Sequence, residues 1–307
     1  MEQPFNPTQE AQIIKQAQNK PKNPDAIINI VAYRSNNQRQ QIAQMYYNQF
    51  GKQIQDDFRS TFSSNFQEAL VALFFPPIDY DCYQIYNAMK GFGTNEDTLI
   101  EVIATRRNER LNQIKLRYEQ LYKKELIKEI ENETSGFFRR ILLALLQAER
   151  QVNPNPNEQH CEDCAKRLFI AQKEKKDILQ DAYIDIFTKK SREELALISK
   201  KYYQWYSKTL IEEVDRLFSS DARRVLKATI YALLSPSEYF AYRIHKAFKK
   251  LSINDTIIIR VLVSRDEIDI KRIKRYYKQL YEISLYDEVK KELSGDYQKL
   301  LLALIGA

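Results

Sequence analysis

The sequence predicts an all-α protein made of four related repeats, each with about five short helices. Apolar residues recur at intervals of three and four, as at Leu99, Val102 and Ile103, which is the spacing of an amphipathic helix. No segment shows the strict alternation of a half-buried strand. Prolines at positions 76–77, 154, 156 and 236 cut the chain into segments of similar length, because proline stops helices. A repeat of about 75 residues holds about five helices of ordinary length.

The four repeats share landmarks in the same order. Each ends in an apolar helical segment, at residues 66–74, 138–146, 222–230 and 297–305. A tyrosine precedes each segment, and a basic residue stands twelve positions before that tyrosine, at Arg34, Arg106, Lys190 and Arg265. We therefore expect a short N-terminal tail (1–5), repeats at 6–75, 78–150, 158–235 and 237–307, and an exposed polar linker at 151–157.

The composition limits the class of protein. A chain of 307 residues is expected to form more than one packed unit. It has no run of 18 apolar residues, so no transmembrane helix is expected, and its N-terminus lacks the basic and apolar regions of a signal peptide. Three cysteines argue against a disulfide framework and fit a reducing cytosol. A net charge of +7 favours anionic partners such as membrane surfaces, acidic proteins or nucleic acid.

Two short segments, residues 89–94 and 133–136, hold three of the six glycines in the chain. Glycine reaches backbone angles closed to other residues and lets carbonyl oxygens approach a ligand. The second segment begins with an acid, Glu133, forty residues after Gly93. A carboxylate opposite turned-out carbonyl oxygens forms the hard-oxygen site that calcium prefers. The alternative is a helix-capping turn with Glu133 merely solvated.

The second repeat resembles an annexin repeat in the order and spacing of residues 89–97 (MKGFGTNED), 104–107 (ATRR), Tyr118 and 133–137 (ETSGF). Four such units cover essentially the whole chain, and the other three match in their core pattern. The resemblance implies four repeats of five α-helices each, arranged as a slightly curved disc. It also implies calcium-dependent binding to acidic phospholipid membranes through the convex face of that disc.

The resemblance implies one calcium site, in repeat 2. The ligands that it implies are the carbonyl oxygens of Met89, Gly91 and Gly93 and the carboxylate of Glu133. Water and a lipid phosphoryl oxygen would complete the roughly 6–8 ligands that calcium prefers. Phe92, between the two glycines, is expected to enter the lipid headgroup layer, and Thr94 is expected to cap the next helix.

The equivalent loops of the other repeats lack the glycines, and two of them lack the acid. The replacements are Asn19, Pro21 and Thr61 in repeat 1, Asp177 and Leu217 in repeat 3, and Lys250 and Ser252 in repeat 4. Repeat 4 keeps its acid, Glu292, which can instead pair with a lysine of the loop. We therefore predict one good calcium site of this type, with minor sites left open.

The degenerate loops share lysines, here called the loop lysines: Lys20, Lys22, Lys173, Lys175, Lys176, Lys249 and Lys250. On the implied disc they all face the membrane. A lysine near an anionic surface contributes about 1 kcal/mol, so our hypothesis is that lysine charge partly replaces calcium in repeats 1, 3 and 4. The alternative is that they are ordinary solvated lysines, and Glu174 and Asp177 offset the repeat 3 cluster.

Three other patterns favour ordinary structural roles. The segment His160-Cys161-x-x-Cys164 has zinc-like spacing, but two thiols on a helix are the simpler interpretation, since structural zinc needs four ligands. Basic residues 271–275 are expected to form a solvated face and not a nucleic-acid site. Four charged residues match the polar centre of the annexin disc, which has been linked to ion conduction, and we expect them to pair and tie its halves together: Asp81, Glu101, Arg106 and Arg260.

We therefore expect a cytoplasmic, peripheral membrane protein that uses Ca²⁺ to bind acidic phospholipid and is a monomer in solution. No nucleophile–base pair or phosphate loop is present, so an enzyme is not expected, and the long regulatory tail of many annexins is not expected either. The rival hypothesis is a structural scaffold for cytoskeletal or other protein partners, with vestigial calcium binding. The loss of the calcium-binding pattern in three of the four loops motivates the rival hypothesis.

Overall fold

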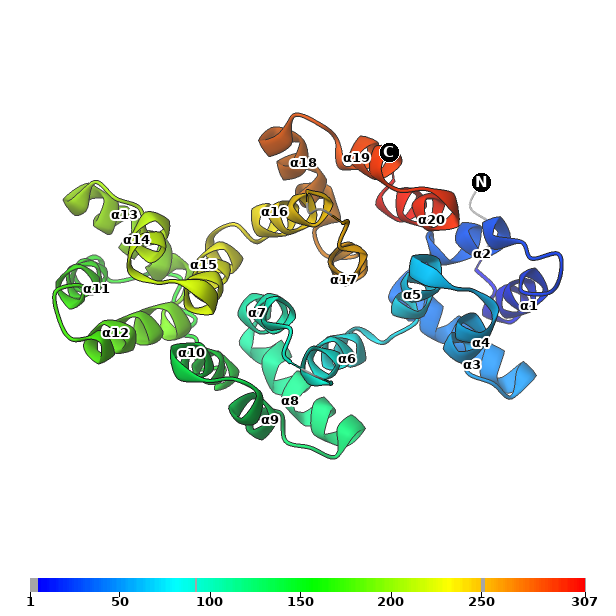
Figure 1. Cartoon of the computed structure of the whole chain (residues 1–307), viewed down its shortest axis with the longest axis horizontal. Coiled ribbons are helices and arrows are strands. Elements are labelled where there is room, and N and C mark those ends of the chain that lie inside the picture. The colour runs from blue at the N-terminus through cyan, green and yellow to red at the C-terminus, as the bar shows by residue number, and fades with distance from the viewer. Residues whose placement is uncertain (1–4, 92, 250–251, 307) are drawn as a thin grey trace. The chain divides into compact units, whose positions relative to one another are not determined.

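The computed structural model describes residues 5–91, 93–249 and 252–306, and over these ranges it contains helices and no strand (Figure 1). Repeat 1 contains α1 (Pro7–Ala17), α2 (Pro24–Val31), α3 (Asn36–Phe50), α4 (Ile54–Thr61) and α5 (Ser64–Leu73). Repeat 2 contains α6 (Pro77–Met89), α7 (Glu96–Thr105), α8 (Asn108–Tyr122), α9 (Leu126–Glu133) and α10 (Gly136–Leu146).

Repeats 3 and 4 have the same order of helices. Repeat 3 contains α11 (Glu158–Ala171), α12 (Lys176–Lys189), α13 (Arg192–Tyr206), α14 (Leu210–Leu217) and α15 (Ser220–Leu234). Repeat 4 contains α16 (Pro236–Phe248), α17 (Asp255–Arg265), α18 (Ile270–Tyr281), α19 (Leu285–Glu292) and α20 (Gly295–Ile305). The prediction of an all-α chain with five helices per repeat is therefore confirmed. Residues 151–157 lie between α10 and α11 outside any helix and are mostly exposed.

The helices pack into two compact units, each described here by itself. Unit 1 comprises Met1–Tyr80 with Phe240–Ala307, so it combines repeats 1 and 4, and in it α5 packs on α17 and α20. Unit 2 comprises Asp81–Tyr239, and in it α7 packs on α15 and α10 packs on α12. Each unit thus buries the apolar fifth helices of its two repeats against a helix of the other repeat.

A buried tyrosine on the third helix anchors each repeat. Tyr46, Tyr118, Tyr202 and Tyr277 are at most 1% exposed. The Tyr46 hydroxyl donates a hydrogen bond of 2.6 Å to Asp57 on the fourth helix. Burial, and then the nearby Glu213 carboxylate, raise the pKa of Tyr202, and burial and Glu288 do the same for Tyr277. These four tyrosines are therefore core residues of their repeats.

The turn between the fourth and fifth helices has the same geometry in every repeat. The fourth helix ends at Thr61, Glu133, Leu217 and Glu292. Three residues later the chain takes a left-handed conformation, with φ of +58° at Ser64, +57° at Gly136, +49° at Ser220 and +66° at Gly295. Such angles favour glycine, and a side chain there costs about 1–2 kcal/mol. The last residue of each fourth helix therefore has an equivalent position before this turn. In repeat 2 that residue is Glu133.

Candidate functional site

The loop between α6 and α7 is held closed at its base. The amide of Asn95 donates to the carbonyl of Ala88 over 2.7 Å, and the Asn95 side chain accepts from the amide of Thr98 at 3.0 Å. Between these anchors, Gly91 and Gly93 have φ of +109° and +90°. Only glycine adopts such angles readily, so the scarce glycines are placed where the backbone needs them. Phe92 lies outside the described residues.

The Thr94 side chain joins this loop to the end of α9. Its hydroxyl lies 3.1 Å from the carbonyl oxygen of Glu133 and 3.3 Å from the Glu133 carboxylate oxygen Oε2. The prediction that Thr94 caps the next helix is wrong, because Asn95 is the N-cap of α7. Asparagine caps at least as well as threonine, and this leaves the Thr94 hydroxyl free to reach across to Glu133.

Glu133 is exposed at this junction, and no basic side chain of the described part of the chain pairs with it. No group of three or more His, Cys, Asp or Glu side chains gathers as a metal site among the described residues. A hard cation at this junction would therefore draw most of its oxygen ligands from loop carbonyls, with Glu133 as the single carboxylate. That donor set suits Ca²⁺, which accepts carbonyl, carboxylate and water oxygens.

A family model described as "Annexin" matches residues 9–73, 80–145 and 239–304. The chain is 34% identical to human annexin A7 over 281 residues, which is 92% of this chain and 58% of that protein. The chain belongs to the annexin family. The 58% coverage means that it spans less than two thirds of the length of annexin A7. Family membership supports calcium-dependent phospholipid binding in general.

Solved annexin structures have the same fold. Chicken annexin V is 33% identical, with a TM-score of 0.93 over 99% of this chain and 96% of that chain. A calcium-bound annexin (Sm)1 is 29% identical, with a TM-score of 0.86 over 99% of this chain and 91% of that chain. The (Sm)1 structure shows that calcium binds to an annexin. No helix among the described residues of our annexin is long and apolar enough to cross a membrane.

In repeat 1 of this annexin a lysine occupies the junction. The Lys22 ammonium donates to the carbonyl oxygen of Thr61, at the end of α4, and lies 5.5 Å from the centre of the Phe62 ring. Thr61 is the counterpart of Glu133, since each is the last residue of its fourth helix. A cation of the chain itself thus contacts the backbone position where repeat 2 presents its acid.

In repeats 3 and 4, cationic side chains also lie at the fourth helix. In repeat 3, Arg216 donates to Gln172 in the first loop and pairs with Glu213 at 2.6 Å. In repeat 4, Lys249 pairs with Glu288 at 3.1 Å, and Glu292 pairs with Lys291 at 2.8 Å. Of the two loop lysines of repeat 4, Lys249 therefore pairs with another acid, and Lys250 lies outside the described residues. Lys249 reaches the buried Glu288 one turn earlier, and Lys291, a neighbour on α19, lowers the pKa of Glu292.

The described loop lysines are exposed at Lys20, Lys22, Lys173, Lys175, Lys176 and Lys249; Lys250 lies outside the described residues. Lys175 is the N-cap of α12, without a capping hydrogen bond from its side chain, and Lys176 is the first residue of the helix. The N-terminus of a helix carries partial positive charge, which favours anions and disfavours lysine. An anion bound at this helix end would relieve that repulsion.

Asp81, one of the four central charged residues, lies in a compact ion-pair cluster. Its Oδ1 lies 2.7 Å from Arg106 Nη2, and its Oδ2 lies 2.8 Å from Arg110 Nε. Burial opposes ionisation of Asp81, but the two guanidinium groups outweigh it, so its pKa lies below the ordinary value. Glu101 and Arg260 are 2% and 1% exposed, and they belong to different units. The sequence did not indicate that Arg110 joins Asp81.

The two neighbouring cysteines lie on α11 and are buried, with Cys161 at 0% and Cys164 at 6% exposed. Burial raises the pKa of the Cys161 thiol to about 11. The His160 ring nitrogen Nε2 lies 3.8 Å from Cys164 Sγ and 2.7 Å from the Lys190 ammonium. Because burial keeps these thiols protonated and metals bind the thiolate, the two cysteines are poor metal ligands.

Proposed function

We propose that this annexin binds acidic phospholipid membranes peripherally and with calcium, and that repeat 2 is its calcium site. The observation that supports the proposal most is the bridge from the Thr94 hydroxyl to Glu133. This bridge brings an unpaired carboxylate next to a loop with two left-handed glycines. The residues that would hold the ion are Met89, Gly91, Gly93 and Glu133.

Bound calcium would supply an open coordination position for a lipid phosphoryl oxygen, while the residues of repeat 2 organise the site. Gly91 and Gly93 give the loop its turn, the Asn95–Ala88 hydrogen bond closes its base, and Thr94 orients Glu133. A site completed by the lipid is weak in solution, because water fills the open positions. We propose that Phe92, which lies between the two glycines in the sequence, enters the headgroup layer.

The loop lysines supply a second, calcium-independent attraction to the same surface in this proposal. Six of the seven are exposed residues in the described chain, and two of them sit at the N-terminus of α12, where an anion is favoured. Each contributes about 1 kcal/mol near an anionic surface, and salt weakens this term. Binding therefore combines a calcium term from repeat 2 with a salt-sensitive term from repeats 1, 3 and 4.

The scaffold remains the second candidate, because three of the four loops have lost the calcium pattern. In that account the protein binds cytoskeletal or other protein partners. We place the protein in the cytoplasm, as a monomer that moves to membranes, and we assign it no enzymatic activity and no nucleic-acid partner. These assignments rest on family membership and composition.

Sedimentation with phosphatidylserine vesicles tests the proposal, with calcium or with chelator, at low and at moderate salt. We expect Glu133→Gln to weaken calcium-dependent binding by about tenfold or more. The matched control is Glu292→Gln, because Glu292 ends its fourth helix in the same way but pairs with Lys291. Equal binding of Glu133→Gln and wild type would contradict the role of repeat 2, and no binding under any condition would favour the scaffold.

A further inference from the structure

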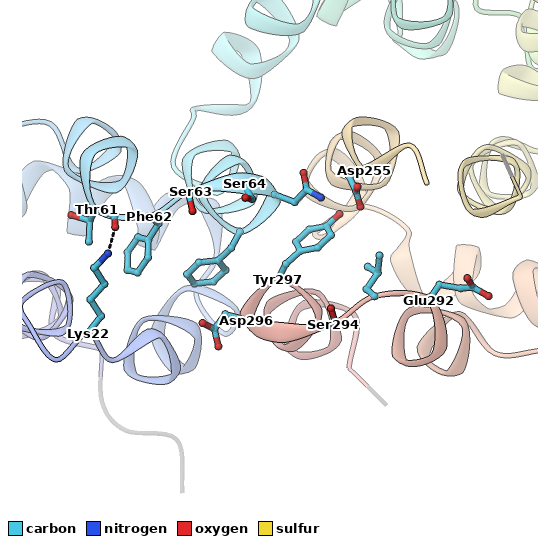
Figure 2. Close-up of a pocket in the computed structure, with 13 residues that line it drawn as sticks. Lys22, Thr61, Phe62, Ser63, Ser64, Asp255, Glu292, Ser294, Asp296 and Tyr297 are labelled. Carbon is cyan, nitrogen blue, oxygen red and sulfur yellow. Dashed lines mark hydrogen bonds between the residues drawn. The ribbon is translucent and has the colours of Figure 1, made fainter. Parts of the chain in front are cut away.

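Unit 1 contains a pocket that the proposed calcium site does not use (Figure 2). Its volume is about 450 Å³, which lies within the range of small-ligand sites. It is formed by the turn before α5, the first residue of α17 and the turn between α19 and α20. Repeats 1 and 4 thus build it together, next to the ends of both of their fourth helices.

Two buried polar groups of this pocket lack a hydrogen bond of good geometry. Tyr297 is 8% exposed, and its hydroxyl is buried without a hydrogen bond of good geometry. The same holds for Oδ1 of Asp255, which also lines the pocket and interacts with Tyr297 and Asn65. Figure 2 shows the Tyr297 hydroxyl directed toward Asp255. A buried polar atom without a hydrogen bond costs about 1–3 kcal/mol, so a ligand that donates hydrogen bonds here would recover part of that cost.

The charges of the pocket are unequally compensated. Asp296 pairs with Lys299 at 3.3 Å, and Glu292 pairs with Lys291 at 2.8 Å. Asp255 has no such cation among the described residues, and burial raises its pKa. Asp255 is half-buried and lines the pocket. Within the described part of the chain, its carboxylate is the one acid of this pocket without an ion pair.

The opposite end of the pocket carries positive charge. Lys22 lines that end and is held there by the Thr61 carbonyl. Figure 2 shows Lys22 and Asp255 on opposite sides of the drawn residues, with Tyr297 between them. The pocket is thus polarised, with an anion-binding group at one end and a cation-binding group at the other.

We infer that this pocket binds a primary ammonium group, held by the Asp255 carboxylate beside the Tyr297 ring and hydroxyl. A primary ammonium donates three hydrogen bonds, and an aromatic face adds a cation–π attraction. A metal ion is less suitable, since two of the three acids that line the pocket, Glu292 and Asp296, already pair with lysines. A quaternary ammonium fits less well, because it has no N–H to donate to Asp255.

The ammonium can come from a lipid headgroup or from a free amine. An aminophospholipid headgroup carries a phosphate close to its ammonium, which suits the charge at both ends of the pocket. A free amine uses the Asp255 end alone. The lipid source rests on the proposed membrane function, whereas amine binding in solution does not.

The lipid source is tested with vesicles in which the acidic lipid has no amine. The protein is titrated with phosphatidylglycerol vesicles diluted either with phosphatidylethanolamine or with phosphatidylcholine. We expect the ethanolamine vesicles to bind the wild type about three- to tenfold more tightly, and Asp255→Asn to lose that preference. Asp296→Asn is the matched control, because Asp296 lines the same pocket but already pairs with Lys299; it should keep the preference.

A second pair of variants protects the test against misfolding. Tyr297→Phe removes the buried hydroxyl and should reduce the preference. Tyr183→Phe is the control: it removes a hydroxyl that is also buried without a hydrogen bond but lies in unit 2, outside the pocket. This variant should keep the preference for ethanolamine vesicles. Failure of the proposed function would abolish binding to both kinds of vesicle, whereas failure of the pocket proposal would abolish only the difference between them.

Free ligands test the pocket without a membrane. Ethanolamine should change the melting temperature or the amide spectrum of the wild type, choline should have a smaller effect, and Asp255→Asn should respond to neither. Binding of ethanolamine in solution without a lipid preference would assign the pocket to a free amine. Equal responses to ethanolamine and choline, or equal losses in Asp255→Asn and Asp296→Asn, would overturn the inference.

Discussion

Replacing Asp81 with asparagine should destabilise unit 2 strongly. The Asp81 side chain is 3% exposed and meets Arg106, at 10% exposed, and Arg110, at 26%. Asparagine keeps the shape but removes the charge and one of the two acceptor oxygens that face the guanidinium groups. Breaking a buried ion pair costs about 3–5 kcal/mol. Because both arginines keep some access to water, we expect a loss of about 3 kcal/mol, at the lower end of that range.

Chemical denaturation of the purified variants measures this loss. The control is Asp56→Asn, since Asp56 is 66% exposed and pairs with Arg59 only three residues away; exposed pairs contribute about 1 kcal/mol or less. The Asp81→Asn midpoint should fall well below that of the wild type, and the Asp56→Asn midpoint should not. Equal midpoints for the two variants would refute the reasoning about Asp81.

The same ion-pair cluster predicts a pH dependence. The pKa of Asp81 is lowered in the folded state, so the unfolded chain binds its proton at a higher pH than the folded chain does. The stabilisation is therefore complete above the unfolded pKa of about 4 and is lost as the pH falls through the lower folded value. The difference in stability between wild type and Asp81→Asn should shrink in acid and stay constant from about pH 5 to 7.

Three further predictions concern the membrane-binding loops. Gly93→Ala places a side chain at φ +90° and should raise the calcium concentration for half-maximal vesicle binding about tenfold. The control Gly51→Ala, at φ +67°, should leave that concentration unchanged. Equal shifts for the two variants would contradict the role of the repeat 2 loop. Thr94→Val removes the bridge to Glu133 and should weaken calcium-dependent binding by about two- to tenfold; an unchanged calcium titration would count against the bridge. Neutralising all seven loop lysines should abolish the binding that persists in chelator at low salt, and undiminished binding would show that these lysines are only solvated.

The fold could be predicted well from the sequence because the same sequence features recur in all four repeats. Proline positions, apolar fifth helices and buried tyrosines such as Tyr46 and Tyr277 recur in each repeat, so four copies of a weak pattern reinforce one another. The unusual backbone of the loop at Gly91 and Gly93 could also be predicted, since glycine adopts such angles readily.

The side-chain partners could not be predicted as well. Thr94 and Asn95 can both cap a helix, and only the fold shows that Asn95 does so while Thr94 reaches Glu133. Lys249 and Glu292 are close in the repeat pattern, but Lys249 pairs with the buried Glu288. The pocket around Tyr297 brings residues 61–66 together with Asp255 and with the turn before α20, which are distant in the sequence, and no local pattern indicates such a site.

The most direct test of the central claim is the number of calcium ions that the protein binds on phosphatidylglycerol vesicles, measured by equilibrium dialysis with radioactive calcium. The account predicts that the wild type and Glu292→Gln bind one more ion than Glu133→Gln at the same lipid concentration. An equal number of ions for Glu133→Gln and wild type would contradict the assignment of the calcium site to repeat 2.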